Sequence, residues 1–132
     1  MTKLTGECLC GAVSFEADGE VPVMANCHCT ACRQSTGSAF ATLMFMKEGD
    51  VKITGTPKTF QHNSDAGSVM TKHFCDKCGT PLFTQNSTRE GMLGLVVEIH
   101  VVDLHDIEGA NKLPMIRGRV LLAEDSTDNQ KL

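Results

Sequence analysis

Short stretches in which apolar and polar residues alternate recur along this 132-residue chain. Residues 11–17 show the alternation most clearly, with valine, phenylalanine and alanine on one face and serine and glutamate on the other. A period of two predicts a strand with one buried face. Residues 18–20, Asp-Gly-Glu, predict a tight turn, and residues 21–26 predict a strand that returns beside the first. Pro22 favours a late start or an edge position for this second strand.

The same criteria predict further strands, most of them bounded by Gly, Pro, Asn or Asp. They cover residues 39–46, 51–54, 59–62, 69–74, 82–85, 92–102 and 113–122. Residues 34–38 are small and polar and predict a loop, and residues 63–68 predict the loop of a hairpin. No segment sustains a helical period. The pattern therefore predicts a mainly β fold of short antiparallel strands in one domain, residues 1–122, followed by a disordered polar tail at 123–132.

Charge and composition narrow the range of functions. The formal net charge is −4, and the chain contains no Trp or Tyr. A protein without a basic surplus or aromatic stacking platforms is not expected to bind nucleic acid. No apolar run reaches transmembrane length, so we expect no membrane partner and a cytoplasmic location. Cytoplasmic thiols stay reduced, so the seven cysteines predict metal binding or catalysis in place of disulfides.

The seven cysteines form three clusters, and the two outer clusters are pairs. Cys8 and Cys10 are two positions apart, so their side chains share one face of an extended chain. Cys75 and Cys78 have the two-residue spacer of a metal-binding knuckle, and Gly79 can supply the positive φ that such turns need. Brought together, the two pairs predict a closed tetrahedral site for a structural zinc ion.

The central cluster consists of Cys27, Cys29 and Cys32. Three ligands from one short segment leave the fourth coordination position of a zinc ion open, as in catalytic zinc sites. These three cysteines are therefore candidate catalytic residues as well as metal ligands. The cofactor prediction is zinc at two sites. None of the five histidines is assigned a catalytic role.

Two other divisions of the thiols remain open from the residues alone. In the first, Cys29, Cys32, Cys75 and Cys78 form a zinc ribbon, and the other three cysteines bind the second ion. In the second, one structural zinc is bound and the remaining cysteines are merely reduced. The division into four and three is preferred because Cys27 and Cys29 lie too close in sequence to be shared easily between two ions.

Three motifs occur in an order found in a known family. They are C-x-C-G from Cys8, C-H-C-x-x-C-R from Cys27 to Arg33, and F-C-x-x-C-G-x-P from Phe74 to Pro81. Over about residues 6–102 the chain resembles the glutathione-dependent formaldehyde-activating family, also called the CENP-V/GFA domain. The resemblance implies an Mss4-like fold built around zinc. It also implies a structural zinc at the two outer pairs and a second, more labile zinc at the central triplet.

The resemblance implies a carbon–sulfur lyase activity, the reversible condensation of formaldehyde with glutathione to S-hydroxymethylglutathione. The expected partner is thus a small-molecule thiol such as a glutathione adduct. Arg33 is the candidate glutathione-binding residue because a guanidinium pairs well with carboxylates; the alternative is that it offsets the thiolate charge. Relatives usually carry a Trp in their last strand, whereas residues 113–122 contain none. The competing function is a non-enzymatic, zinc-stabilised binding module, which predicts a large exposed apolar patch.

Overall fold

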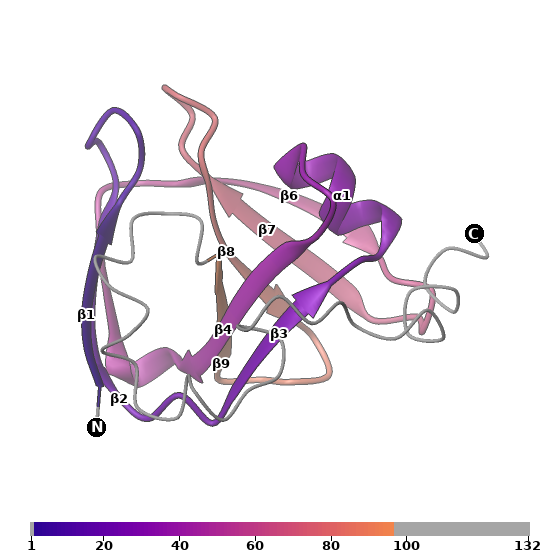
Figure 1. The fold of residues 1–132 in the computed structure, drawn as a ribbon, viewed down its shortest axis with the longest axis horizontal. Coiled ribbons are helices and arrows are strands. Elements are labelled where there is room, and N and C mark those ends of the chain that lie inside the picture. The colour runs from indigo at the N-terminus through magenta and orange to yellow at the C-terminus, as the bar shows by residue number, and fades with distance from the viewer. Residues whose placement is uncertain (1, 97–132) are drawn as a thin grey trace.

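Two antiparallel sheets form most of residues 2–96, the part of the chain that the computed structural model describes (Figure 1). The smaller sheet has the order β1-β2-β5, and its strands are Thr2–Glu7, Ser14–Gly19 and Val51–Thr54. The larger sheet has the order β3-β4-β9-β8-β7-β6. Its strands in that order are Val23–Cys27, Ala41–Lys47, Met92–Val96, Pro81–Asn86, Val69–Phe74 and Lys58–Asn63. The predicted mainly β fold of short antiparallel strands is confirmed.

Two short helical segments connect the strands. Helix α1 (Thr30–Thr36) joins β3 to β4 and lies at one end of both strands (Figure 1). The 3-10 helix η1 (Glu48–Asp50) leads from β4 into β5, where the chain crosses from the larger sheet to the smaller one. The chain therefore crosses from the smaller sheet to the larger one before β3 and returns to the smaller sheet after β4.

The predicted alternation along β2 sets the register of the smaller sheet. Phe15 and Ala17 are buried, while Glu16 and Asp18 are exposed. Phe15 pairs with Gly6 on β1 and with Ile53 on β5. A slip by one residue would move the apolar side chains to the solvent face, so burial fixes this register.

Side chains of both sheets meet in one buried cluster. Its largest fully buried members are Met24, Met44, Met46 and Leu95, all from the larger sheet. The smaller sheet contributes Leu4, Phe15 and Ala17. Burying a side chain of the size of Leu or Met stabilises a fold by about 1.5–3 kcal/mol. This shared core keeps the sheets together and positions the loops at their ends.

The predicted hairpin of residues 11–17 and 21–26 is wrong. Strand β2 pairs with β1 and β5, whereas β3 pairs with β4 in the other sheet. Residues 18–20 therefore do not form a hairpin turn between two paired strands. The place beside β2 is taken by β1, which sequence reasoning missed. The expected edge position of the second strand is confirmed, since β3 begins one residue after Pro22 and lies at the edge of the larger sheet.

The predicted loop at residues 34–38 is also wrong over residues 34–36, because α1 extends to Thr36. This helix spans only seven residues, too few to show an apolar period. Cys29 caps its start, and Gly37 ends it in the left-handed region, with φ at 69°. Predicted strand residues 97–102 and 113–122, and the tail 123–132, lie outside the described residues.

Candidate metal centre

Four cysteines from the two sheets meet at one end of the molecule. Cys8 and Cys10 follow β1 in the smaller sheet, and Cys75 and Cys78 lie between β7 and β8 in the larger sheet. Figure 1 shows the turn after β1 and the loop between β7 and β8 rising at the same end of the fold. All four sulfurs lie within 4.8 Å of one another. We call these residues the four-cysteine group.

The spacing of these sulfurs suits a tetrahedral metal ion. A zinc ion at its usual Zn–S distance of about 2.3 Å separates its ligand sulfurs by about 3.8 Å. The Sγ atoms of Cys8 and Cys10 are 3.6 Å apart, and those of Cys10 and Cys75 are 3.7 Å apart. The donor set, four thiolates without an oxygen ligand, also suits a soft or borderline metal ion. The residues present therefore fit a structural zinc.

Local turns aim both pairs at this point. The amide of Gly79 donates to the carbonyl of Cys75 at 2.8 Å, and Gly79 has a φ of 76°, as the knuckle motif predicts. The first pair differs from the expectation, because Cys8 and Cys10 do not lie on an extended strand. Gly11 donates to the carbonyl of Cys8 at 3.0 Å with a φ of 77°, so the pair lies in a second tight turn.

Hydrogen bonds to the sulfurs prepare this site for thiolates. The amide of Val13 donates to Sγ of Cys8 at 3.3 Å, in the core. The hydroxyl of Thr80 is 3.1 Å from Sγ of Cys78, and its hydrogen bond lowers the pKa of Cys78 to about 5. Each such bond stabilises the deprotonated sulfur, the form that binds a metal ion.

The other three cysteines, the triplet Cys27, Cys29 and Cys32, come from the junction of β3 and α1. Cys27 ends the strand, Cys29 is the N-cap of the helix, and Cys32 lies in its first turn. Cys29 keeps an extended backbone, and the amide of Cys32 donates to its sulfur at 3.3 Å. The three sulfurs also lie within 4.8 Å of one another. The structure thus groups the thiols as four and three, and it does not assemble the alternative ribbon.

The triplet holds only part of the charge that a metal ion needs. The Cys29 sulfur accepts hydrogen bonds from the thiols of Cys27 and Cys32, and the bond from Cys27 has the larger effect. These bonds lower the pKa of Cys29 to about 2. Hydrogen bonding within the triplet raises the pKa of Cys32 and of Cys27. Three adjacent negative charges repel one another, so full ionisation of the triplet is unfavourable without a cation. A bound cation would allow all three to ionise.

A cavity of about 190 Å³ adjoins the triplet at Cys32. Its walls come from α1 and from five strands of the larger sheet, and apolar side chains predominate: Leu43, Phe60, Phe74, Phe83 and Val96. The hydroxyls of Ser35 and Thr36 and the ammonium of Lys72 supply polar groups. Concave apolar sites with few polar groups are typical of small-molecule binding sites. The triplet therefore has a cavity next to it in which a ligand can approach.

Arg33 does not line this cavity. Its side chain is exposed, and Nη2 donates to Oγ1 of Thr30 on the same helix at 3.4 Å. The cation that lines the cavity is Lys72 on β7, which sequence reasoning missed. His73, also on the lining, stacks on Phe83 with the ring centroids 4.0 Å apart. The only sequence signal for these two side chains is that they lie two and three positions before Cys75.

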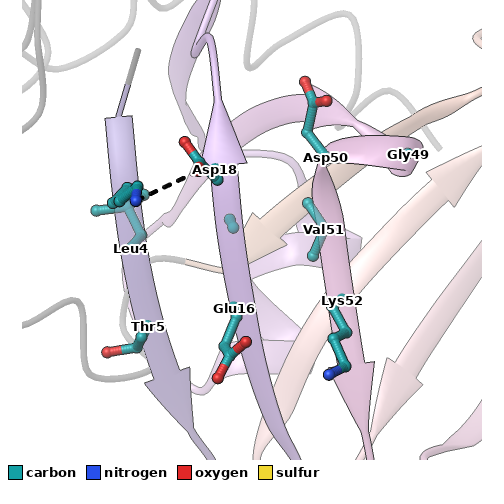
Figure 2. A pocket seen from close by; sticks show the side chains of 10 residues that line it. Leu4, Thr5, Glu16, Asp18, Gly49, Asp50, Val51 and Lys52 are labelled. Atoms are coloured by element: carbon teal, nitrogen blue, oxygen red, sulfur yellow. Dashed lines mark ion pairs between the residues drawn. The ribbon is translucent and has the colours of Figure 1, made fainter.

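A larger hollow, of about 560 Å³, lies over the smaller sheet and contains no thiol (Figure 2). Its charged side chains are of both signs, and all but that of Asp50 are exposed on neighbouring strands. Lys3 pairs with Asp18 at 3.7 Å, and Glu16 lies opposite Lys52 in the register of β2 and β5. Such solvent-facing pairs are ordinary on a sheet surface. The cavity beside the triplet is the better candidate for chemistry.

Comparisons with known proteins agree with this picture. A family model described as glutathione-dependent formaldehyde-activating enzyme matches residues 3–112, a span that includes both cysteine groups and the cavity. Among curated proteins, none matches the chain. A crystal structure of a Rhodobacter sphaeroides protein is similar, with a TM-score of 0.62 and 21% identity, covering 88% of this chain and 96% of that one. At that identity the likeness shows the fold. Within residues 2–96, no helix is long and apolar enough to cross a membrane.

Proposed function

Because the chain belongs to the family of glutathione-dependent formaldehyde-activating enzymes, we propose that it is a zinc-dependent carbon–sulfur lyase. Its substrate is a thiol adduct such as S-hydroxymethylglutathione. The single observation that carries the proposal is the position of the triplet. Three clustered thiols adjoin a cavity of small-molecule type, whereas the four-cysteine group has a full ligand set of its own.

Cleavage of the adduct is a balanced reaction without an external oxidant or reductant. The carbon–sulfur bond breaks and its electron pair stays on the sulfur, which leaves as a thiolate. The electrons of the hydroxyl O–H bond form the new C=O bond of formaldehyde, and the hydroxyl proton passes to solvent. Cys27, Cys29 and Cys32 would hold the zinc ion, which would supply Lewis-acid stabilisation of the leaving thiolate.

The chain's own residues prepare the site for this chemistry. The carbonyl of Cys32 accepts hydrogen bonds from the hydroxyls of Ser35, at 3.2 Å, and Thr36, at 2.8 Å. These bonds fix the helical turn that carries the Cys32 sulfur. Buried Leu43 and Phe83 line the cavity and exclude water from the side on which the adduct lies. The Cys32 sulfur is therefore held at the junction of β3 and α1.

Arg33 can meet only the outer part of a glutathione-sized substrate, because it lies outside the cavity on the exposed face of α1. A cavity of about 190 Å³ is smaller than the roughly 300–1,000 Å³ usual for drug-sized ligands. In the proposed complex the cavity thus encloses the sulfur and its neighbouring atoms. One peptide end of glutathione lies outside, where Arg33 pairs with its carboxylate.

The test combines metal content with activity. We would measure zinc per chain and the rate of S-hydroxymethylglutathione cleavage for the wild type and for Cys29→Ser. We expect two zinc ions in the wild type and one in the variant, with an unchanged circular dichroism spectrum and no cleavage above the uncatalysed rate. Gln34→Ser is the matched control, because Gln34 is exposed on the same helix and does not line the cavity. It should keep both zinc ions and full activity.

Full cleavage by Cys29→Ser would contradict the proposal. A wild type that binds two zinc ions but cleaves no thiol adduct would favour the non-enzymatic binding module. Among the described residues, the exposed large apolar side chains are Leu9, Val23, Phe60 and Val69. They belong to one turn and to three different strands, so they are not evidence for the single large patch that a binding module predicts. The position of the triplet beside a cavity therefore favours the enzyme.

A further inference from the structure

Lys72 carries the only full charge among the described residues that line the cavity beside the triplet. No Asp or Glu of residues 2–96 contributes to that lining. Lys72 projects from β7, is half-buried, and places Nζ 3.3 Å from Oγ of Ser35 on α1. The ammonium therefore lies where the helix meets the sheet, on the wall that Cys32 also lines.

The hydrogen-bonding capacity of this ammonium is largely unused within residues 2–96. An ammonium has three N–H donors and no acceptor. The Ser35 hydroxyl takes one donor, and no carboxylate of the described residues lies within ion-pair distance of Lys72. Lys3 shows the contrast, because it has Asp18 as its partner. The charge of Lys72 also acts on the Cys29 thiol and contributes to lowering the pKa of that group. A half-buried cation that has no carboxylate partner among residues 2–96 and lies at a ligand cavity favours an anionic ligand.

The cavity thus presents two different attractions to one small molecule. The triplet, of which Cys32 lines the cavity, holds a sulfur at one point of the wall. Lys72 holds an anion at another point, and apolar side chains line the rest of the cavity. We propose that Lys72 binds a carboxylate of the thiol substrate and makes the site selective for carboxylated thiols over neutral ones. This inference rests on the proposed function, and it names the substrate class of the same site.

Lys72 has one alternative role, which is to offset the negative charge of the triplet without touching a ligand. The two roles differ in what they affect. A charge-balancing lysine changes metal retention and weakens every thiol alike. A carboxylate-binding lysine changes only the ligands that carry a carboxylate.

The experiment compares two thiols of similar size, one with a carboxylate and one with a neutral hydroxyl in its place. Zinc-loaded protein is titrated calorimetrically with mercaptopropionate and with mercaptopropanol, using the wild type, Lys72→Met, Lys72→Arg and Lys52→Met. Methionine keeps most of the lysine stem and removes the charge, while arginine keeps the charge. Lys52 is the matched control, because it is an exposed strand lysine that lines only the hollow over the smaller sheet. Zinc content is measured for every variant.

We expect the wild type to bind mercaptopropionate about tenfold more tightly than mercaptopropanol, the size of one charge-assisted hydrogen bond. Lys72→Met should lose this preference and keep its zinc, Lys72→Arg should recover part of it, and Lys52→Met should match the wild type. Equal weakening of both thiols in Lys72→Met, loss of its zinc, or no preference in the wild type would each overturn the inference.

The binding experiment is independent of catalysis, so the two proposals fail separately. A charge preference that depends on Lys72, in a protein that cleaves no adduct, supports the carboxylate site and contradicts the lyase. Cleavage of adducts with the same preference in the wild type and in Lys72→Met supports the lyase and overturns the role of Lys72.

Discussion

The side-chain hydroxyl of Thr80 accepts a hydrogen bond from the backbone amide of Leu9, with Oγ1 and N 3.1 Å apart, although the residues are 71 positions apart in sequence. The same hydroxyl lies 3.1 Å from Sγ of Cys78 and can donate to it. One oxygen therefore joins the turn that carries Cys8 and Cys10 to the knuckle of the other sheet. Hydrogen bonds of the chain itself thus help to hold the four-cysteine group together.

Replacing Thr80 with valine should weaken metal binding at the four-cysteine group by about tenfold, since partners of metal ligands typically contribute 10–100-fold in affinity. The measurement is chelator competition in a Cys29→Ser background, where only the four-cysteine group retains a metal ion. Thr59→Val, an exposed threonine on β6, serves as the control and should have no effect. Equal affinities for the two variants would show that the Thr80 hydroxyl is not needed.

Cys75→Ser should unfold the protein, whereas Cys29→Ser should not. Cys75 is completely buried and belongs to the group that links the two sheets. Metal binding at structural zinc sites supplies about 10–16 kcal/mol, as much as the whole stability of a typical domain. We expect Cys75→Ser to lose its cooperative thermal transition in circular dichroism. A wild-type melting temperature for this variant would mean that the shared core alone supports the fold.

Local patterns predicted the strands better than their partners. Strands β5 and β7 have the predicted bounds, 51–54 and 69–74, because Gly, Pro or Asp flank them closely. The partner of β2 was predicted wrongly because a turn signal at 18–20 reports a change of direction and carries no information about the other strand. Pairing is decided by burial in the shared core, which depends on the whole chain.

The cysteine groups could be predicted from spacing, whereas the cavity could not. Knuckle spacing and thiol chemistry are local, so the four-plus-three grouping follows from the sequence. The cavity brings Ser35 and Lys72 together across 37 positions and across a helix that lacks a sequence signal. Arg33 was chosen as the candidate cation because it is next to Cys32 in sequence, but on a helix the adjacent residue points elsewhere.

Gly55→Ala should destabilise the protein more than Gly67→Ala does. Both glycines have a positive φ, 97° at Gly55 and 85° at Gly67. An alanine in this left-handed region lowers the free energy of unfolding by about 1–2 kcal/mol. At Gly67 an added Cβ meets nothing within 4 Å, whereas at Gly55 it overlaps the backbone oxygen of Ala12 in the segment that follows Cys8 and Cys10. Urea unfolding of the two variants isolates the cost of this overlap. Equal free energies of unfolding would show that the cysteine-bearing segment moves freely.

Phe60→Ala should lower activity without affecting stability. The Phe60 side chain on β6 is 60% exposed, so its truncation removes little buried area and should change the free energy of unfolding by less than about 1 kcal/mol. It nevertheless lines the cavity that contains Cys32. We expect KM for S-hydroxymethylglutathione to rise several-fold with a smaller change in kcat. Val69→Ala is the matched control, since Val69 is 40% exposed on the adjacent strand and does not line the cavity. If both variants kept the wild-type KM, the adduct would have to bind away from this wall, and the cavity would lose its role as the substrate site.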